Sequence, residues 1–374
     1  MIEEKLPPTE LLIGHNNLEI IKTRAKNLGK NAMLVTGKSS MEKLGLLKKC
    51  KDYLEDIDPI VFNKIPPNPT DEIIREGVEL FKENNCDLII ALGGGSSIDA
   101  AKLISLSAYN KKDVWGFTEK QIPKGNYPII AAPTTSGTGS HVTHYAVVTN
   151  KDTKEKKTVK THYIHPNLAI YDIEIAKHMP KKLTASTGID VFMHALETFT
   201  KKGDHPITDM FSINAISLLS KNLPKAYENG DDKKARTNMA LADTYAGIAI
   251  DSTGTHSIHG FAHPLSGRNP KLAHGEALAI IAPQIVKYNE EKADESLKRK
   301  QKVVAQIFGK ESLSKAIKKL NEKIGFDKGL SDYFTKEQIE KLKEDCKGYR
   351  KGSIDKNPIK MNEKQIEEII EESK

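Results

Sequence analysis

The chain has 374 residues, and at roughly 150 residues per domain this length predicts about two domains. Acids and bases are interleaved, and the basic runs at residues 154–160 and 298–302 are short, so the net charge of +7 predicts a solvated surface rather than a nucleic-acid-binding protein. No apolar stretch approaches the roughly 20 residues of a membrane span, and three separated cysteines exclude a disulfide framework, so we expect a cytoplasmic protein without a membrane partner.

The first half of the sequence alternates apolar runs with helical patterns. Residues 71–85 carry apolar side chains at the spacing of one helix face. Short apolar runs that suit buried strands lie at residues 31–36, 59–62, 87–92, 128–132 and 168–171. Strands buried on both faces and alternating with helices predict a doubly wound parallel sheet of the Rossmann-like α/β class.

The second half has almost no strand-like runs. Apolar stripes at residues 211–219 and 239–250 have helical spacing, and the final third is rich in Lys and Glu with the same periodicity. A proline at position 180 follows the last expected strand. We therefore predict an α/β domain at residues 1–180 and an all-helical domain at residues 181–374.

Two small-residue turns follow expected strands. Gly93-Gly94-Gly95-Ser96 opens a helix, where glycine lets a ligand approach the main chain and the free N–H groups can hold a phosphate. This turn is neither a GxGxxG nor a Walker loop, so a tight turn without a ligand stays possible. The second turn, at residues 133–140, is rich in Ser and Thr and ends a strand at the sheet edge where such folds bind ligands.

A cluster of polar residues interrupts the apolar helices of the second half. Asp190 and His194 lie four positions apart among apolar neighbours, so both point from one helix face. His259 and His263 have the same spacing, and His274 follows. A buried carboxylate is costly unless it is paired or binds a cation, and carboxylate with imidazole suits Zn²⁺ or Fe²⁺. These residues predict a divalent metal site, although a hydrogen-bonded core pair would explain Asp190 and His194 alone.

The sequence resembles the iron-containing (group III) alcohol dehydrogenase family along nearly its whole length. The matching segments, in family order, are GGGSSIDAAK at residues 93–102, PTTSGTGS at 133–140, STGIDVFMHALETF at 186–199, and HGFAHPLSG with AHGEA across 259–277. The resemblance implies a nucleotide-binding domain followed by a helical metal-binding domain. It also implies hydride transfer between NAD(P)(H) and a small alcohol or aldehyde.

Carried over position by position, the resemblance implies a role for each matching residue. The metal ligands would be Asp190, His194, His259 and His274, with His263 beside the substrate as the catalytic proton relay. The cofactor would contact Gly94, Gly95, Ser96 and Asp99 on its pyrophosphate and nicotinamide side, and Thr134, Thr135 and Thr138 on its adenosine side. A lysine would also contact it, either Lys157 or its neighbour Lys156, since the match is ambiguous by one residue. The family also implies a homodimer or a larger homo-oligomer.

The turn after the strand at 31–36 bears on the choice of nicotinamide cofactor. An acidic residue there would hold the adenosine ribose and repel a 2′-phosphate. This chain instead has Gly37, Lys38, Ser39 and Ser40, which supply hydroxyls and a cation. We therefore predict binding of NADP(H) in preference to NAD(H).

The sequence departs from the family at His141, where relatives usually have Glu. We expect His141 to be a partly exposed loop residue. His256, Arg268 and Lys271 lie near the metal segments in sequence and raise the hypothesis of an anionic substrate. Two other functions stay open, namely a glycerol-dehydrogenase-like polyol oxidoreductase and a non-catalytic nucleotide- or metal-binding relative.

Overall fold

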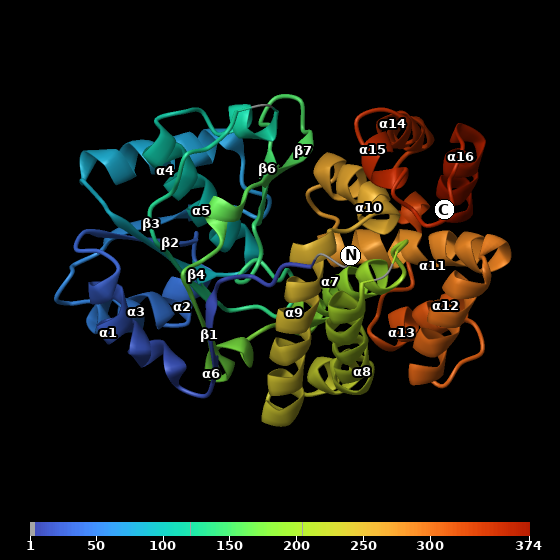
Figure 1. The fold of residues 1–374 in the computed structure, drawn as a ribbon, viewed down its shortest axis with the longest axis horizontal. Coiled ribbons are helices and arrows are strands. Elements are labelled where there is room, and N and C mark those ends of the chain that lie inside the picture. The colour runs from blue at the N-terminus through green and yellow to red at the C-terminus, as the bar shows by residue number, and fades with distance from the viewer. Residues whose placement is uncertain (1–3, 120, 204) are drawn as a thin grey trace. The chain divides into compact units, whose positions relative to one another are not determined.

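The computed structural model describes residues 4–119, 121–203 and 205–374. The contacts within the chain divide it into two compact units. One unit comprises Leu6–Met179, and the other comprises Pro180–Lys374 together with Glu4 and Lys5. In Figure 1 the first unit runs from blue to green and the second from green to red.

A six-stranded, entirely parallel sheet forms the centre of the first unit, in the order β1-β8-β5-β4-β2-β3. Its strands are β1 (Glu10–Gly14), β2 (Ala32–Gly37), β3 (Ile60–Ile65), β4 (Leu88–Gly93), β5 (Ile129–Pro133) and β8 (Leu168–Asp172). The predicted fold class is confirmed, and each of the five expected apolar runs forms a strand. The edge strand β1 and an antiparallel hairpin of β6 (Tyr145–Thr149) and β7 (Lys156–Lys160) were not predicted.

Alternating side chains of the central strand β4 enter two separate cores. Ile89 and Ala91 pack with α4 (Asp71–Glu83) and α5 (Gly95–Asn110), whereas Ile90 and its alternate neighbours pack on the opposite face. That face is covered by α1 (Ile21–Arg24), α2 (Ser40–Lys43) and α3 (Leu46–Tyr53), as Figure 1 shows. A short helix, α6 (Ile173–Ala176), ends the unit. Burial on both faces explains why these strands are apolar without alternation.

The chain changes direction between β2 and its neighbour β4. From β2 it moves to β3 at one edge, whereas from β4 it moves through β5 to β8 on the other side. Ligands of open α/β sheets bind beyond the carboxyl ends of the strands at such a switch point. The turns that follow β2, β4 and β5 are therefore the candidate nucleotide site.

The second unit has helices but no strand among its described residues. Its central helix α7 (Lys181–Phe199) packs against α8, α9 and α11, and α10 packs against α11. The other helices are α8 (Pro206–Glu228), α9 (Lys233–Thr253), α10 (Ser257–Arg268), α11 (His274–Lys292), α12 (Glu295–Ile307), α13 (Leu313–Lys323), α14 (Lys336–Lys347), α15 (Lys351–Ile354) and α16 (Glu363–Glu372). Among the described helices of the whole chain, none has the length and apolarity required to cross a membrane.

Candidate functional site

Three helices of the second unit supply the polar cluster. Helix α7 carries Asp190 and His194 one turn apart, on a helix whose apolar neighbours enter the main core. His259 and His263 repeat this spacing on α10, and His274 is the first residue of α11. All five side chains are at least nine-tenths buried except His274, of which 25% is exposed. The cluster therefore lies inside the unit and is open on the side of His274.

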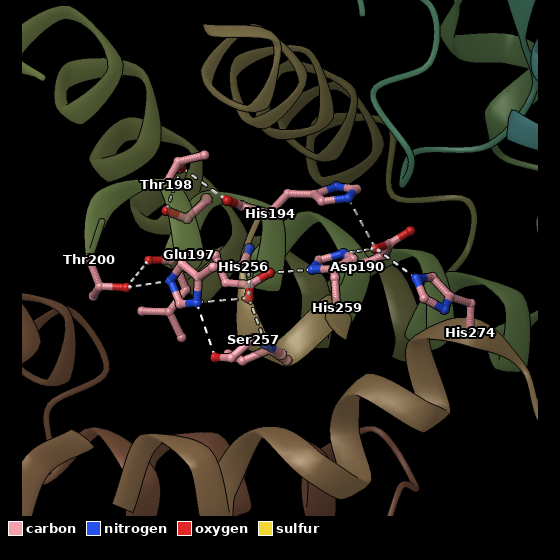
Figure 2. A network of polar contacts seen from close by, with 12 residues as sticks. Asp190, His194, Glu197, Thr198, Thr200, His256, Ser257, His259 and His274 are labelled. Carbon is pink, nitrogen blue, oxygen red and sulfur yellow. Dashed lines mark hydrogen bonds and ion pairs between the residues drawn. The ribbon is translucent and has the colours of Figure 1, made fainter. Parts of the chain in front are cut away.

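One carboxylate oxygen is the centre of this cluster. Asp190 Oδ1 lies 3.2 Å from His259 Nε2, 3.4 Å from His194 Nε2 and 4.0 Å from His274 Nε2. Figure 2 shows the three imidazoles directed at Asp190. Donor atoms of Asp190, His259 and His274 also lie within 4.8 Å of one another. The structure thus brings together all four predicted ligands, and one carboxylate with three imidazoles fits Zn²⁺ or Fe²⁺.

A second buried carboxylate, Glu197, stands behind His259. Glu197 lies on α7 seven positions after Asp190 and is completely inaccessible to solvent. Its Oε2 accepts a hydrogen bond from His259 Nδ1, and its Oε1 accepts from the backbone N–H groups of His256 and Ile258, at 3.2 Å and 2.7 Å. Glu197 therefore joins α7 to the first turn of α10 and fixes the orientation of the His259 ring (Figure 2).

Charges within this cluster compensate one another. Burial raises the pKa of Asp190, but the three neighbouring imidazoles more than offset burial and hold that pKa well below its usual range. The same balance, with His256 and His259 as partners, lowers the pKa of Glu197 to about 2. Burial lowers the pKa of His259, but the two carboxylates together raise it to about 9. Without a metal the raised pKa of His259 favours its imidazolium beside the two carboxylates, and a divalent cation would displace a proton from it.

The network continues from Glu197 toward the C-terminal part of the chain. His256 Nδ1 lies 3.1 Å from Glu197 Oε1 and 3.1 Å from Ser257 Oγ. Ser257 donates to Asn357 Oδ1 at 2.6 Å, and Asn357 donates to Asn289 Oδ1 at 2.7 Å. Burial lowers the pKa of the His256 imidazole despite the nearby carboxylate, so His256 is a neutral element of the buried network.

The residues that suggested an anionic substrate are engaged elsewhere. His256 belongs to the buried network, and Arg268 forms a bidentate ion pair with Asp345. Lys271 is exposed. These three residues therefore do not form one cationic pocket, because His256 is held in the buried network, Arg268 is paired with Asp345 and Lys271 is exposed.

His263 lies beside the ligand set rather than in it. Its ring is 8% exposed, and its centroid is 5.3 Å from that of His274 and 6.3 Å from that of His259. The nitrogens of His194, His259 and His274 instead lie within 4.0 Å of Asp190 Oδ1. The structure therefore places the His263 ring next to His274 and His259.

A close contact between α7 and α11 holds His274 in place. Gly275 donates its N–H to Ser186 Oγ at 3.2 Å. A Cβ added at Gly275 would lie 1.8 Å from the backbone oxygen of Ser186, a distance at which no side chain fits. Gly275 therefore allows the start of α11 to approach the helix that carries Asp190.

In the first unit, the turns after β4 and β5 pack against each other. A Cβ at Gly94 would lie 3.0 Å from Thr135 Oγ1, and one at Gly95 would lie 2.5 Å from Thr138 Cγ2. Thr134 is buried and donates its N–H to Gly93 O. Ser96 stands half-buried in the first turn of α5, which begins without a side-chain cap. The predicted phosphate-binding residues are thus adjacent, with uncapped N–H groups at a helix start.

Asp99 holds the surrounding loop together. Its Oδ1 accepts from Ser140 Oγ at 2.8 Å and its Oδ2 accepts from Val147 N at 2.9 Å. Burial raises the pKa of its carboxyl group, although these hydrogen bonds and Lys102 favour the ionised form. Asp99 thus links the turn after β5 to strand β6.

The turn after β2 is accessible at the switch point. Gly37 is half-buried, and Lys38, Ser39 and Ser40 are exposed. Lys157, on β7, is half-buried with its Nζ 4.9 Å from the centre of the Trp115 ring. The side chain of its neighbour Lys156 is instead buried and donates to Asn68. Of the two lysines between which the sequence was ambiguous, Lys157 is the more accessible to a ligand.

His141 is not a partly exposed loop residue, so that prediction is wrong. Only 1% of the residue is exposed, and its ring meets the edge of Tyr171 at a centroid distance of 5.3 Å. The Tyr171 hydroxyl in turn donates to Ser136 Oγ in the turn after β5. Burial, together with the Lys102 ammonium, lowers the pKa of His141 to about 3. A neutral imidazole is therefore compatible with this site next to a buried cation.

Comparison with known proteins agrees with this arrangement. Residues 8–173 match the family described as iron-containing alcohol dehydrogenase, and residues 184–374 match the C-terminal part of the Fe-containing alcohol dehydrogenase family. The chain belongs to the iron-containing alcohol dehydrogenase family, and it is an NAD(P)-dependent oxidoreductase.

Individual relatives cover most of the chain. It is 33% identical to the NADPH-dependent butanol dehydrogenase of Clostridium saccharobutylicum, over 97% of this chain and 96% of the relative. It is 36% identical to the NAD-dependent methanol dehydrogenase of Bacillus methanolicus, over 76% and 75%. An archaeal alcohol dehydrogenase from a Red Sea brine pool, solved by crystallography, has 39% identity and a TM-score of 0.95, with 100% of this chain and 99% of that chain covered.

Proposed function

We propose that this protein is a metal-dependent aldehyde reductase and alcohol dehydrogenase that acts on small, uncharged substrates and prefers NADP(H). The observation that carries the proposal is the convergence of three imidazole nitrogens on Asp190 Oδ1. The His274 side chain is 25% exposed, so a substrate oxygen could approach an ion held by these residues from that side. Names of relatives such as butanol and methanol dehydrogenase support a short alcohol or aldehyde.

Asp190, His194, His259 and His274 would hold one Fe²⁺ or Zn²⁺ ion. When bound, this ion supplies Lewis acidity that polarises a carbonyl group, and NADPH supplies the hydride. The protein contributes the fixed positions of the ligands, because Glu197 and Gly275 hold His259 and His274 against α7. The apolar neighbours of α7 exclude water from the closed side of the cluster.

His263 is proposed to transfer the proton that the product oxygen needs. An imidazole titrates near neutral pH and can therefore exchange a proton with solvent. The position of its ring, 5.3 Å from that of His274 and thus toward the exposed side of the cluster, supports this role.

The preference for NADP(H) is supported by the turn after β2. Gly37, Lys38, Ser39 and Ser40 provide no carboxylate to repel a 2′-phosphate, and Lys38 adds an exposed cation. The two curated relatives named above use different nicotinamide cofactors, so this preference rests on the turn itself.

Replacing Gly37 by Asp is expected to shift the cofactor preference toward NAD(H). The site has room, because a Cβ at Gly37 would meet only Ile65 O at 3.7 Å and Ser40 Oγ at 3.8 Å. The ratio of kcat/KM for NADPH to that for NADH should fall about tenfold or more, which corresponds to about 1.4 kcal/mol of lost 2′-phosphate binding. Gly37→Asn is the matched neutral control and should leave most of the ratio intact. An equal shift in both variants would contradict the charge-based argument.

The proposed function itself is tested by oxidation of NADPH with a panel of short aldehydes. Uncharged and anionic aldehydes of equal length are compared before and after treatment with a chelator. We expect turnover of the uncharged aldehydes, loss of turnover on chelation and its return with Fe²⁺ or Zn²⁺. Turnover that survives complete removal of metal would refute the proposal, and a clear preference for anionic aldehydes would refute its substrate class.

A further inference from the structure

The hydrogen bonds of Glu197 are divided between its two carboxylate oxygens. Oε1 accepts from the backbone N–H groups of His256 and Ile258, 3.2 Å and 2.7 Å away, and lies 3.1 Å from His256 Nδ1. Oε2 faces Nδ1 of His259, whose Nε2 is directed at Asp190. Glu197 is fully buried, so water does not replace any of these partners.

We propose that Glu197 is a positioning residue that keeps the His259 proton on Nδ1 and thereby determines how tightly the centre holds its metal. The inference rests on the proposed function, since it assumes that His259 is a ligand. A carboxylate is purely an acceptor, so the Nδ1 atom that faces it must be protonated. Nε2 is then the nitrogen whose lone pair is available to a metal.

The surroundings of Glu197 make Glu197→Gln an informative substitution. The amide oxygen must take the place of Oε1, because the two backbone N–H groups there require an acceptor. The amide NH₂ group is then directed at His259 Nδ1. Nδ1 must accept this hydrogen bond, which places the proton on Nε2 and blocks coordination by that atom. A single substitution of nearly equal size thus reverses the tautomer.

The experiment measures the affinity of the metal-free protein for Zn²⁺ by competition with a chromogenic chelator. We expect Glu197→Gln to raise the Zn²⁺ dissociation constant about 10- to 100-fold, the range seen when such outer partners of ligands are changed. The visible absorption spectrum of the Co²⁺-loaded variant should also differ from that of the wild type, since loss of one nitrogen ligand changes the coordination geometry. Thermal unfolding of both metal-free forms checks that the variant folds.

Glu290→Gln is the matched control. Glu290 lies on α11 and likewise accepts from a backbone N–H, that of Leu313, and from the hydroxyls of Ser312 and Ser314. None of these hydrogen bonds of Glu290 reaches the metal cluster. The Zn²⁺ affinity of the Glu290→Gln variant should therefore equal that of the wild type. An equal loss of affinity in both variants would indicate a general structural effect and overturn the inference.

Two results separate the inference from the proposed function. If the wild type binds Zn²⁺ and Glu197→Gln binds it equally well, the inference is wrong while the function stands. If the wild type does not bind Zn²⁺, the metal-dependent function fails first. ¹⁵N NMR of histidine-labelled, Zn²⁺-loaded wild type tests the inference without any variant. The inference requires that Nδ1 of His259 carries the proton, and a protonated Nε2 would overturn it.

Discussion

Asp190→Asn is expected to abolish tight metal binding and to lower kcat/KM for aldehyde reduction by about 1000-fold. Asp190 is the only carboxylate among the four proposed ligands, and its Oδ1 lies between the three imidazole nitrogens. Asparagine keeps the size but removes the charge that offsets a divalent cation. The expected loss corresponds to about 4 kcal/mol of transition-state stabilisation, within the range that a Lewis-acidic metal supplies. Metal content by mass spectrometry and initial rates measure the two effects.

Two further substitutions show whether this loss is specific. Asp294→Asn changes the N-cap of α12, where Asp294 accepts from Leu297 N and Asn caps equally well, so metal content and rate should not change. His263→Ala should retain the metal but lower kcat, because His263 is not one of the four proposed ligands, whose nitrogens lie within 4.0 Å of Asp190 Oδ1. Loss of metal from His263→Ala would favour a role in orienting ligands. Full metal content in Asp190→Asn would contradict the assignment of the site.

Gly275→Ala is expected to have the second large effect. Alanine in a helix normally gains up to about 1 kcal/mol over glycine. Here its methyl group would lie 1.8 Å from the backbone oxygen of Ser186, and neither helix can yield without moving a whole segment. The overlap should dominate, with a loss of about 3 kcal/mol in the free energy of unfolding. Displacement of α11 should also draw His274 away from Asp190 and weaken metal binding.

Urea unfolding of the metal-free protein measures the first part of this prediction, and Zn²⁺ affinity measures the second. Gly352→Ala is the control, because a Cβ at that position in α15 meets nothing within 4 Å. It should be neutral or slightly stabilising. A Gly275→Ala variant as stable as Gly352→Ala would show that the approach of α11 to α7 is looser than the structure indicates.

The sequence predicts a strand or helix well here where the apolar pattern of its own residues identifies it. Strands such as β4 are apolar throughout because both faces are covered, and helix α4 has a one-sided apolar stripe. The hairpin strand β7 (Lys156–Lys160) was not predicted, because its lysines form a basic run that is typical of a solvated surface. In the structure Lys156 is buried through a hydrogen bond to Asn68, a contact across 88 positions that no local pattern reveals. Tertiary pairing, rather than propensity, makes this segment a strand.

The same distinction applies to the site. The four ligands and the two glycine- or threonine-rich turns lie in recognisable motifs, so their proximity was predictable. Glu197 stands in one of those motifs, and its place seven positions after Asp190 put it on the ligand face of α7. Its role nevertheless depends on the opposite helix α10, whose backbone N–H groups it accepts. The positions of His256 and His141 in the chain indicate only that they lie near the motifs, whereas burial in the folded protein lowers the pKa of both imidazoles.

The most direct test of the metal centre is a titration of the metal-free wild-type protein with metal, in which the rate of NADPH-dependent reduction of a short aldehyde is measured. Fe²⁺ is added under anaerobic conditions, and Zn²⁺ is tested in parallel. The rate should rise linearly and reach its plateau at one equivalent of metal per chain for at least one of the ions. Full activity before any metal is added, or no binding and no turnover with either ion, would contradict the central claim that Asp190, His194, His259 and His274 form a catalytic metal site.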